Sequence, residues 1–380
     1  MATTMIATTP APKIINQPLK RVRIASIEAE LGMLWAQFNR DSGGGHTVMR
    51  ACMSNLIIYC DTVEEAAVVN QEITAIVDVH PARVLLLVGD GKPSEGTMEA
   101  LITIYYTALN EDWQVCAERI DVIASPASAE RLPSVARSQL IGDLPTALWW
   151  VSRRPPPEVG DVFFQLAELA DQIIYDNMGW INPIKGVSAM TRWVAAQQNE
   201  QVVYNLAWRR FSVWRKLLGQ MLDPQIAPGA LDDLRVIEID HGPHALAMTW
   251  LMVGWLASQL KWQPVDGKQL SNSELVWKFH NHRHEIKITA KRLPKGEPLL
   301  YRLLLDWSQA QQENKLCFER LDNDRIGIVE ALSTVPARVF AAQVPERATL
   351  VSAQLAHRNR DKIFESALKS ANAMAAVFQL

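Results

Sequence analysis

The sequence predicts an α/β fold that becomes mixed α+β in its second half, with an N-terminal parallel-type sheet covered by helices. Two apolar runs, Asn55–Cys60 and Arg83–Val88, are typical of buried strands, and an amphipathic helix pattern separates them. Strand, helix and strand in this order form the usual right-handed parallel crossover. Because 48% of the 380 residues are hydrophobic, we expect two or three packed domains.

The elements around this crossover are predicted from caps and breakers. Ser26 can cap a helix whose apolar residues reach Phe38, and the glycines at 43–45 end it. Thr62 and Glu65 have the spacing of a capping box at the start of the crossover helix. Strands are predicted at 101–109, 113–124, 146–151 and 172–175, and helices at 128–141 and 162–170.

Three regions are predicted along the chain. Residues 1–40 form a flexible tail and the first helix, residues 41–157 an N-terminal domain, and residues 158–380 a C-terminal domain. The three prolines that end at Pro157 stiffen the chain there. A boundary near Gly179 is the alternative, because a helix and a strand follow the prolines at once.

The sequence of the C-terminal region predicts helices and strands in mixed order. Helices are predicted at 207–222, 244–260 and 350–378, and strands at 234–239 and between 285 and 330. The longest apolar stretch, 245–257, is shorter than the roughly 20 residues that span a bilayer. We therefore expect a buried helix there and no membrane partner.

Charge and cysteine usage exclude further classes. The net charge of −3 gives no overall field for nucleic acid, and the first 20 residues lack the apolar core of a secretory signal. Four scattered cysteines suit a reducing compartment, so a cytoplasmic protein is predicted.

No catalytic, metal or cofactor motif emerges. Gly89–Lys92 follows a strand but lacks the spacing of a phosphate loop. His280, His282 and His284 would share one side of a strand, although an exposed polar edge is the favoured interpretation. Asp240–His244 is interpreted as a strand-to-helix turn rather than as a ligand set.

Two groups of residues are candidates for regulation or binding. Cys60 and Cys116 both lie in predicted strands. They could form a redox-active pair, or each could be an inert buried thiol. On the predicted helix 207–222, an apolar stripe is flanked by arginines, which indicates either a core helix or a partner surface with bidentate arginine contacts. The candidate partner-binding residues are Trp208, Arg209, Arg210, Trp214 and Arg215.

Several segments resemble the OpcA family of glucose-6-phosphate dehydrogenase assembly proteins. These segments occur in the same order as in the family, at 144–150, 169–176, 205–224, 254–262 and 350–357. The resemblance implies a non-catalytic, allosteric activator that binds glucose-6-phosphate dehydrogenase in the oxidative pentose phosphate pathway. It also implies a cyanobacterial type of protein and redox control that involves thioredoxin, and it supplies no catalytic residues.

Two rival functions remain open at this point. The first is a sugar-phosphate or nucleotide-dependent enzyme that uses carboxylates such as Asp171 and Asp176. The second is a redox-sensing module based on the Cys60–Cys116 pair, which could coexist with activation.

Overall fold

The computed structural model describes residues 14–16, 18–41, 52–93, 97–109, 112–180, 182–196, 201–309, 312–330 and 338–379. The chain divides into two compact units. The first comprises Met1–Ser152, Asp161–Ile173 and Val351–Arg358, and the second comprises Arg153–Gly160, Ile174–Leu350 and Asn359–Leu380. The chain thus leaves the first unit at the proline segment, returns at residue 161, and leaves again within β8 (Gln172–Tyr175).

A largely parallel sheet forms the core of the first unit. Its strand order runs β1-β5-β6-β4-β3-β7, and β2 pairs with β5. The β3–β4, β4–β6 and β3–β7 pairs are parallel, whereas β1, β2 and β6 pair with β5 in antiparallel fashion. The strands are β1 (Ile14–Asn16), β2 (Lys20–Val22), β3 (Ser54–Thr62), β4 (Ala82–Asp90), β5 (Met98–Leu109), β6 (Asp112–Ala124) and β7 (Thr146–Trp150). The prediction of a parallel-type sheet is confirmed.

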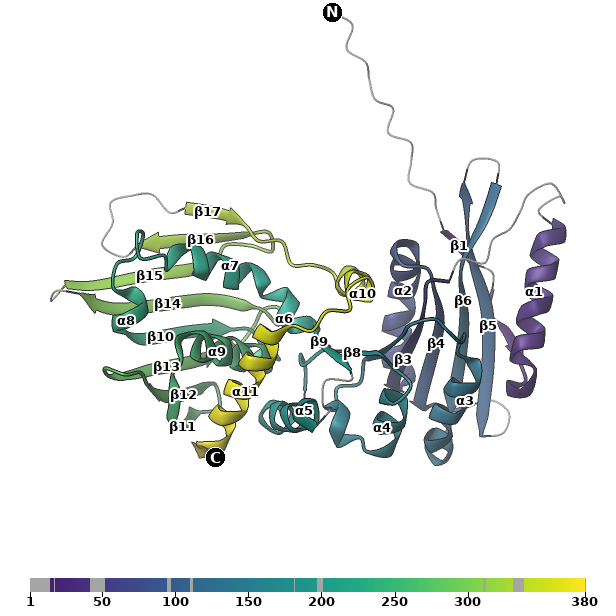
Figure 1. The fold of residues 1–380 in the computed structure, drawn as a ribbon, viewed down its shortest axis with the longest axis horizontal. Coiled ribbons are helices and arrows are strands. Elements are labelled where there is room, and N and C mark those ends of the chain that lie inside the picture. The colour runs from purple at the N-terminus through teal and green to yellow at the C-terminus, as the bar shows by residue number, and fades with distance from the viewer. Residues whose placement is uncertain are drawn as a thin grey trace, which may run out of the picture. The chain divides into compact units, whose positions relative to one another are not determined.

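Helices cover both faces of this sheet (Figure 1). They are α1 (Ile27–Asp41), α2 (Val63–Val79), α3 (Leu132–Gln139) and α4 (Asp161–Ala167), with a 3-10 turn at Pro126–Arg131 before α3. Thr62 caps α2 by accepting a hydrogen bond from the Glu65 amide, as the capping-box spacing predicts. The Glu65 carboxylate accepts from the amide of Asp61, one residue before the position that the motif predicts.

A mixed sheet forms the core of the second unit. Its order is β17-β16-β15-β14-β10-β13-β12-β11-β18; among the described residues, the β10–β13 and β11–β18 pairs are parallel and the other pairs antiparallel. Its strands are β10 (Leu234–His241), β11 (Gln263–Ser271), β12 (Glu274–His280), β13 (Glu285–Arg292), β14 (Leu300–Gln309), β15 (Gln312–Arg320), β16 (Arg325–Glu330), β17 (Arg338–Ala341) and β18 (Phe378–Gln379). The mixed second half is therefore confirmed.

The helices of the second unit pack on this sheet and on one another (Figure 1). They are α5 (Pro183–Ala196), α6 (Leu206–Arg210), α7 (Ser212–Met221), α8 (Ala230–Asp233), α9 (Leu246–Leu260) and α11 (Lys362–Ala376); β9 (Val202–Asn205) precedes α6. The buried helix α9 packs against α11, where Gly254 lets the two backbones approach closely. No helix among the described residues is long and apolar enough to cross a bilayer.

Two predicted helices differ from the structure, and two strands lie outside the predicted ranges. The helix expected at 207–222 is broken at Phe211, where the Trp208 carbonyl accepts a hydrogen bond from the Arg215 side chain. The helical end is interrupted between α10 (Arg347–Leu355) and α11. Strands β11 and β12 were not predicted, since β11 is largely polar and contains Pro264 and Gly267.

Candidate functional site

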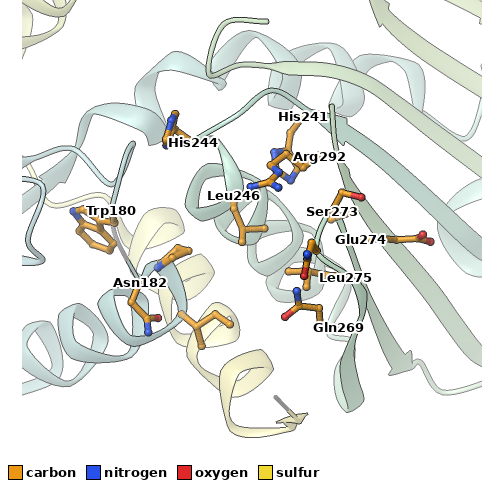
Figure 2. A pocket seen from close by; sticks show the side chains of 14 residues that line it. Trp180, Asn182, His241, His244, Leu246, Gln269, Ser273, Glu274, Leu275 and Arg292 are labelled. Atoms are coloured by element: carbon orange, nitrogen blue, oxygen red, sulfur yellow. The ribbon is translucent and has the colours of Figure 1, made fainter. Parts of the chain in front are cut away.

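A polar cavity of about 390 Å³ is the candidate site, and all of its walls belong to the second unit. Side chains from α5, β10, α9, β11, β12 and β13 line it (Figure 2). The residues that carry polar groups into the lining are Trp180, Asn182, His241, His244, Gln269, Asn272, Ser273, Glu274 and Arg292. This size lies within the range of small-molecule pockets in proteins, about 300–1,000 Å³.

The turn from β10 into α9 fixes the two histidines of the cavity. Gly242 is required there, because a Cβ atom at this position would lie 1.9 Å from the carbonyl oxygen of Glu297. His244 adopts a φ of +64°, in the left-handed region, and its carbonyl accepts a hydrogen bond from the Gly179 amide at 3.3 Å. The predicted strand-to-helix turn is confirmed, and its conformation is closely constrained.

His241 contacts the cavity although only 2% of the residue is exposed. Its Nδ1 lies 2.8 Å from the carbonyl oxygen of Gly242, so Nδ1 carries the proton in the neutral ring. Burial lowers the pKa of His241, and the hydrogen bond to the Gly242 carbonyl opposes this effect. The neutral ring therefore offers Nε2 as a hydrogen-bond acceptor.

Arg292 supplies the positive charge of the cavity. The parallel register of β10 and β13 sets Arg292 beside His241, and Figure 2 shows the two side chains next to each other. Within the described residues no carboxylate forms an ion pair with the Arg292 guanidinium. Glu274 also lines the cavity, but its carboxylate extends away from Arg292 in this view.

The opposite wall is formed by Trp180 and the start of α5. The Trp180 ring stacks on Tyr175 with a centroid distance of 5.8 Å and an interplanar angle of 11°. Gly186 makes room for it, since a Cβ atom there would lie 2.3 Å from Cε3 of Trp180. Asn182 caps α5 by accepting from the Lys185 amide, which leaves its NH₂ group as a donor.

The predicted partner surface needs correction, because the structure places both of its tryptophans in the core. Trp208 and Trp214 are each 1% exposed. The Trp208 indole nitrogen donates to the Asp361 carboxylate at 2.8 Å, and its ring packs against Phe364 of α11. Apolar burial explains this outcome, since the stripe of α6 and α7 packs inward. Rings enclosed in this way do not form a docking surface.

The arginines of this segment have three different environments. Arg210 forms an ion pair with Asp176 at 2.7 Å and is largely buried. Arg215 stacks on the Trp208 ring, and burial lowers its pKa to about 10. Arg209 is exposed, with its guanidinium carbon 5.4 Å from the centroid of the Tyr204 ring. Of the five candidate residues, Arg209 alone keeps an exposed side chain.

The Cys60–Cys116 pair receives no support from the structure. Cys60 is fully buried in β3. Its register partner on β4 is Val88, and the register partner of Val88 on β6 is Ile123. The side chain of Cys116 lies outside the described residues, but its position is seven residues from Ile123 in sequence. That separation corresponds to roughly 23 Å along a strand, far beyond the roughly 7 Å limit between Cα atoms of a disulfide.

The other candidate residues have structural partners. Asp171 accepts a hydrogen bond from the Thr146 amide at 2.8 Å, and Asp176 is paired with Arg210 as described above. The strand geometry considered for the three histidines is wrong, because β12 ends at His280 and a turn follows. In the described part of the chain, no group of three or more His, Cys, Asp or Glu residues is placed to hold a metal ion.

Two family models match consecutive parts of the chain. Both describe the OpcA-type subunit of glucose-6-phosphate dehydrogenase: the model of its N-terminal domain matches residues 73–192, and the model of its C-terminal domain matches residues 201–368. Together they cover most of the chain in the order of a single family. The chain belongs to the OpcA family. The resemblance seen in the sequence segments is thereby confirmed.

Three proteins that the chain resembles come from cyanobacteria. A protein of Nostoc punctiforme, provisionally named OxPP cycle protein OpcA, is 28% identical over 53% of this chain and 42% of its own length. A protein of the same name from Synechococcus elongatus is 22% identical over 75% of this chain and 63% of its own length. The chain thus covers less than two thirds of the length of each of these relatives.

Solved structures match at low similarity. Gal80p from Kluyveromyces lactis matches with a TM-score of 0.48 and 10% identity, covering 91% of this chain and 95% of its own. Glucose-6-phosphate 1-dehydrogenase from Mycobacterium avium matches with a TM-score of 0.47 and 8% identity, covering 83% and 90%. At these scores, no conclusion about activity follows.

The cavity was missed by sequence reasoning. Its histidines flank a Gly-Pro turn, and that pair was the one available signal. Arg292 gave no signal, because strand pairing rather than sequence spacing brings it to His241.

Proposed function

We propose that this chain is a non-catalytic partner of glucose-6-phosphate dehydrogenase that promotes its assembly and activates it allosterically in the cytoplasm. The observation that carries the proposal is the match to the models of both domains of the dehydrogenase-associated family, at residues 73–192 and 201–368. The names of the cyanobacterial relatives place them in the OxPP cycle, which agrees with this role.

Activation without chemistry requires a difference in affinity. A partner shifts the dehydrogenase toward its active state only if it binds that state more tightly than the others. A coupling of about 1–3 kcal/mol changes the affinity for substrate roughly 5–150-fold. We therefore expect the chain to lower the apparent KM, to raise the rate, or to do both.

The test is dehydrogenase kinetics with and without a saturating concentration of the chain. Parallel assays under reducing and oxidising conditions also test thioredoxin-dependent control, which stays a prediction for this chain. If the kinetics are the same with and without the chain under both conditions, and no complex forms in a direct binding assay, the proposed function is wrong.

Arg209 is the remaining candidate contact from the original surface. Its exposed guanidinium can pair with carboxylates of a partner in bidentate fashion. Arg209→Glu is expected to weaken the complex because it reverses this charge. Arg235→Glu, at an exposed position of β10, is the charge-matched control. Equal affinities of the two variants would remove Arg209 from the interface.

A further inference from the structure

We propose that the cavity of the second unit binds a small metabolite that carries both an oxyanion, phosphate or carboxylate, and hydroxyl groups. This inference stands apart from the proposed function, because it concerns direct binding to the chain alone. Three features of the cavity carry it: an unpaired cation, an acceptor on the ring of His241 and a neutral donor on the opposite wall.

The cationic side of the cavity selects an anion. Arg292 brings a guanidinium that no described carboxylate neutralises, and guanidinium groups bind phosphate and carboxylate in bidentate fashion. The N-terminal end of α9 borders the same space through His244 and Leu246. Its first residue follows Ala245, which has no side chain that could cap the helix. Free amides at a helix start favour an anion further.

His241 adds a hydrogen-bond acceptor that a ligand hydroxyl can use and a bare anion cannot. It is almost fully buried, its Nδ1 hydrogen is used by the Gly242 carbonyl, and within the described residues no donor meets its Nε2. At the cavity wall, this ring nitrogen can accept a hydrogen bond from a ligand hydroxyl. The NH₂ group of Asn182 can in turn donate to a hydroxyl or an oxyanion from the opposite wall (Figure 2).

Size and polarity exclude other classes of ligand. A volume of about 390 Å³ suits a small molecule rather than a macromolecular segment. The positive charge of Arg292 disfavours a metal cation. The Glu274 carboxylate, which could attract one, extends away from Arg292 (Figure 2). The ligand class that remains is a small polyol phosphate or polyol carboxylate.

Calorimetric titration of the full chain in the absence of any dehydrogenase tests this inference. The probes are glucose 6-phosphate, gluconate, inorganic phosphate and glucose. At least one of the two hydroxylated anions is expected to bind, and which one binds distinguishes phosphate from carboxylate. Glucose is expected not to bind, and inorganic phosphate is expected to bind more weakly than the tighter hydroxylated anion.

Arg292→Gln is expected to weaken binding about tenfold or more, because a charged hydrogen-bond partner is lost. Lys291→Gln removes the same charge from the neighbouring exposed position of β13 and is expected to leave the affinity unchanged. Absence of binding by both hydroxylated anions, binding of glucose as tight as that of the anions, or equal weakening by the two variants would overturn the site. Equal binding of inorganic phosphate would overturn the role given to His241.

Discussion

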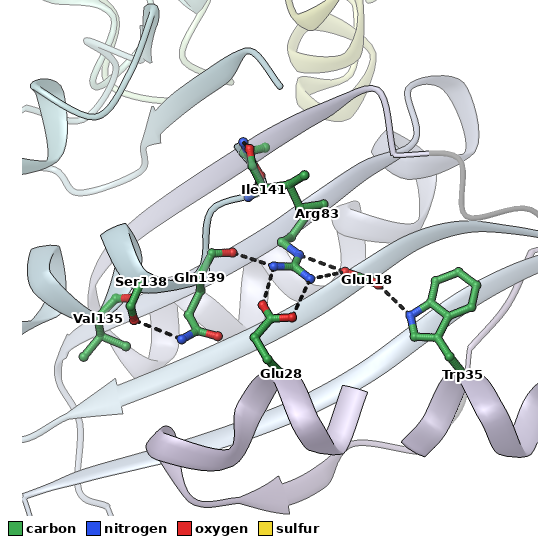
Figure 3. A network of polar contacts seen from close by, with 9 residues as sticks. Glu28, Trp35, Arg83, Glu118, Val135, Ser138, Gln139 and Ile141 are labelled. Carbon is green, nitrogen blue, oxygen red and sulfur yellow. Dashed lines mark hydrogen bonds and ion pairs between the residues drawn. The ribbon is translucent and has the colours of Figure 1, made fainter. Parts of the chain in front are cut away.

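The Arg83 guanidinium lies against the fully buried carboxylate of Glu118 in the first unit. Nε and Nη2 of Arg83 are 2.8 and 2.7 Å from Oε2 of Glu118. The Trp35 indole nitrogen donates to the other carboxylate oxygen at 2.6 Å, and Arg83 also contacts Glu28 of α1 and donates to the carbonyl of Gln139 (Figure 3). One buried charge pair therefore connects α1 to the sheet and to α3.

Arg83→Met is expected to destabilise the first unit by about 3–5 kcal/mol, because it removes the guanidinium that pairs with the fully buried Glu118 carboxylate. Urea unfolding measures this change. Glu28→Gln is the control from the same network; its side chain is 53% exposed, so the loss should stay within about 1 kcal/mol. Similar losses for both variants would show that burial does not set the strength of this network.

Two helical glycines should respond in opposite directions to alanine. At Gly254 a Cβ atom would lie 2.5 Å from the Ala367 carbonyl oxygen of α11, so Gly254→Ala is expected to destabilise the second unit by about 1–3 kcal/mol. At Gly32 of α1 nothing lies within 4 Å, so Gly32→Ala should stabilise the first unit by about 0.5–1 kcal/mol. Thermal unfolding tests both, and stabilisation by Gly254→Ala would contradict the close helix approach.

Asp361 has two roles that substitutions can separate. Its Oδ1 caps α11 by accepting from the amides of Ile363 and Phe364, and its Oδ2 accepts from the buried Trp208 indole. Asp361→Ala loses the cap, worth about 0.5–2 kcal/mol, and also leaves the indole N–H unpaired, at about 1–3 kcal/mol. Asp361→Asn can keep the cap but turns an NH₂ group toward Trp208.

We therefore expect the free energy of unfolding to decrease in the order wild type, Asp361→Asn, Asp361→Ala. Chemical denaturation monitored by tryptophan fluorescence provides the measurement. An asparagine variant as unstable as the alanine variant would mean that the cap contributes nothing at this site.

Stability should fall as the pH drops below about 6.5, the usual pKa of histidine. Burial lowers the pKa of His80, and the nearby Arg358 acts in the same direction. The unfolded chain therefore takes up a proton at a pH where the folded chain does not. The contribution of His80 to the free energy of unfolding is thus complete above the unfolded pKa and is lost as the pH falls below it. Burial also lowers the pKa of His241, which adds to the slope with the same sign.

Urea midpoints between pH 7.5 and 5 measure this dependence. His80→Gln keeps a polar group near the Ser54 hydroxyl, which lies 3.1 Å from Nε2 in the wild type, and it removes the titration. The variant should show a shallower decrease than the wild type. An unchanged slope, or a midpoint that rises toward pH 5, would contradict the assignment.

Much of the fold could be predicted because its signals are local. The apolar runs of β3 and β4 and the Thr62 cap of α2 depend on residues within a few positions of one another. Burial on both faces makes such strands continuous in apolar residues. The polar strand β11 lacks this signal, since most of its side chains are exposed.

The sequence by itself determined the family, the fold class and the order of the main elements. The tertiary structure decided which side of the α6–α7 helix pair is buried, and it removed Trp208 and Trp214 from the candidate surface. Strand register alone brought Arg292 beside His241, because residues far apart in the chain meet only when β10 and β13 pair. The physical reason is that helix and strand periodicity acts between neighbours in sequence, whereas a binding cavity is formed by side chains that become neighbours only in the folded chain.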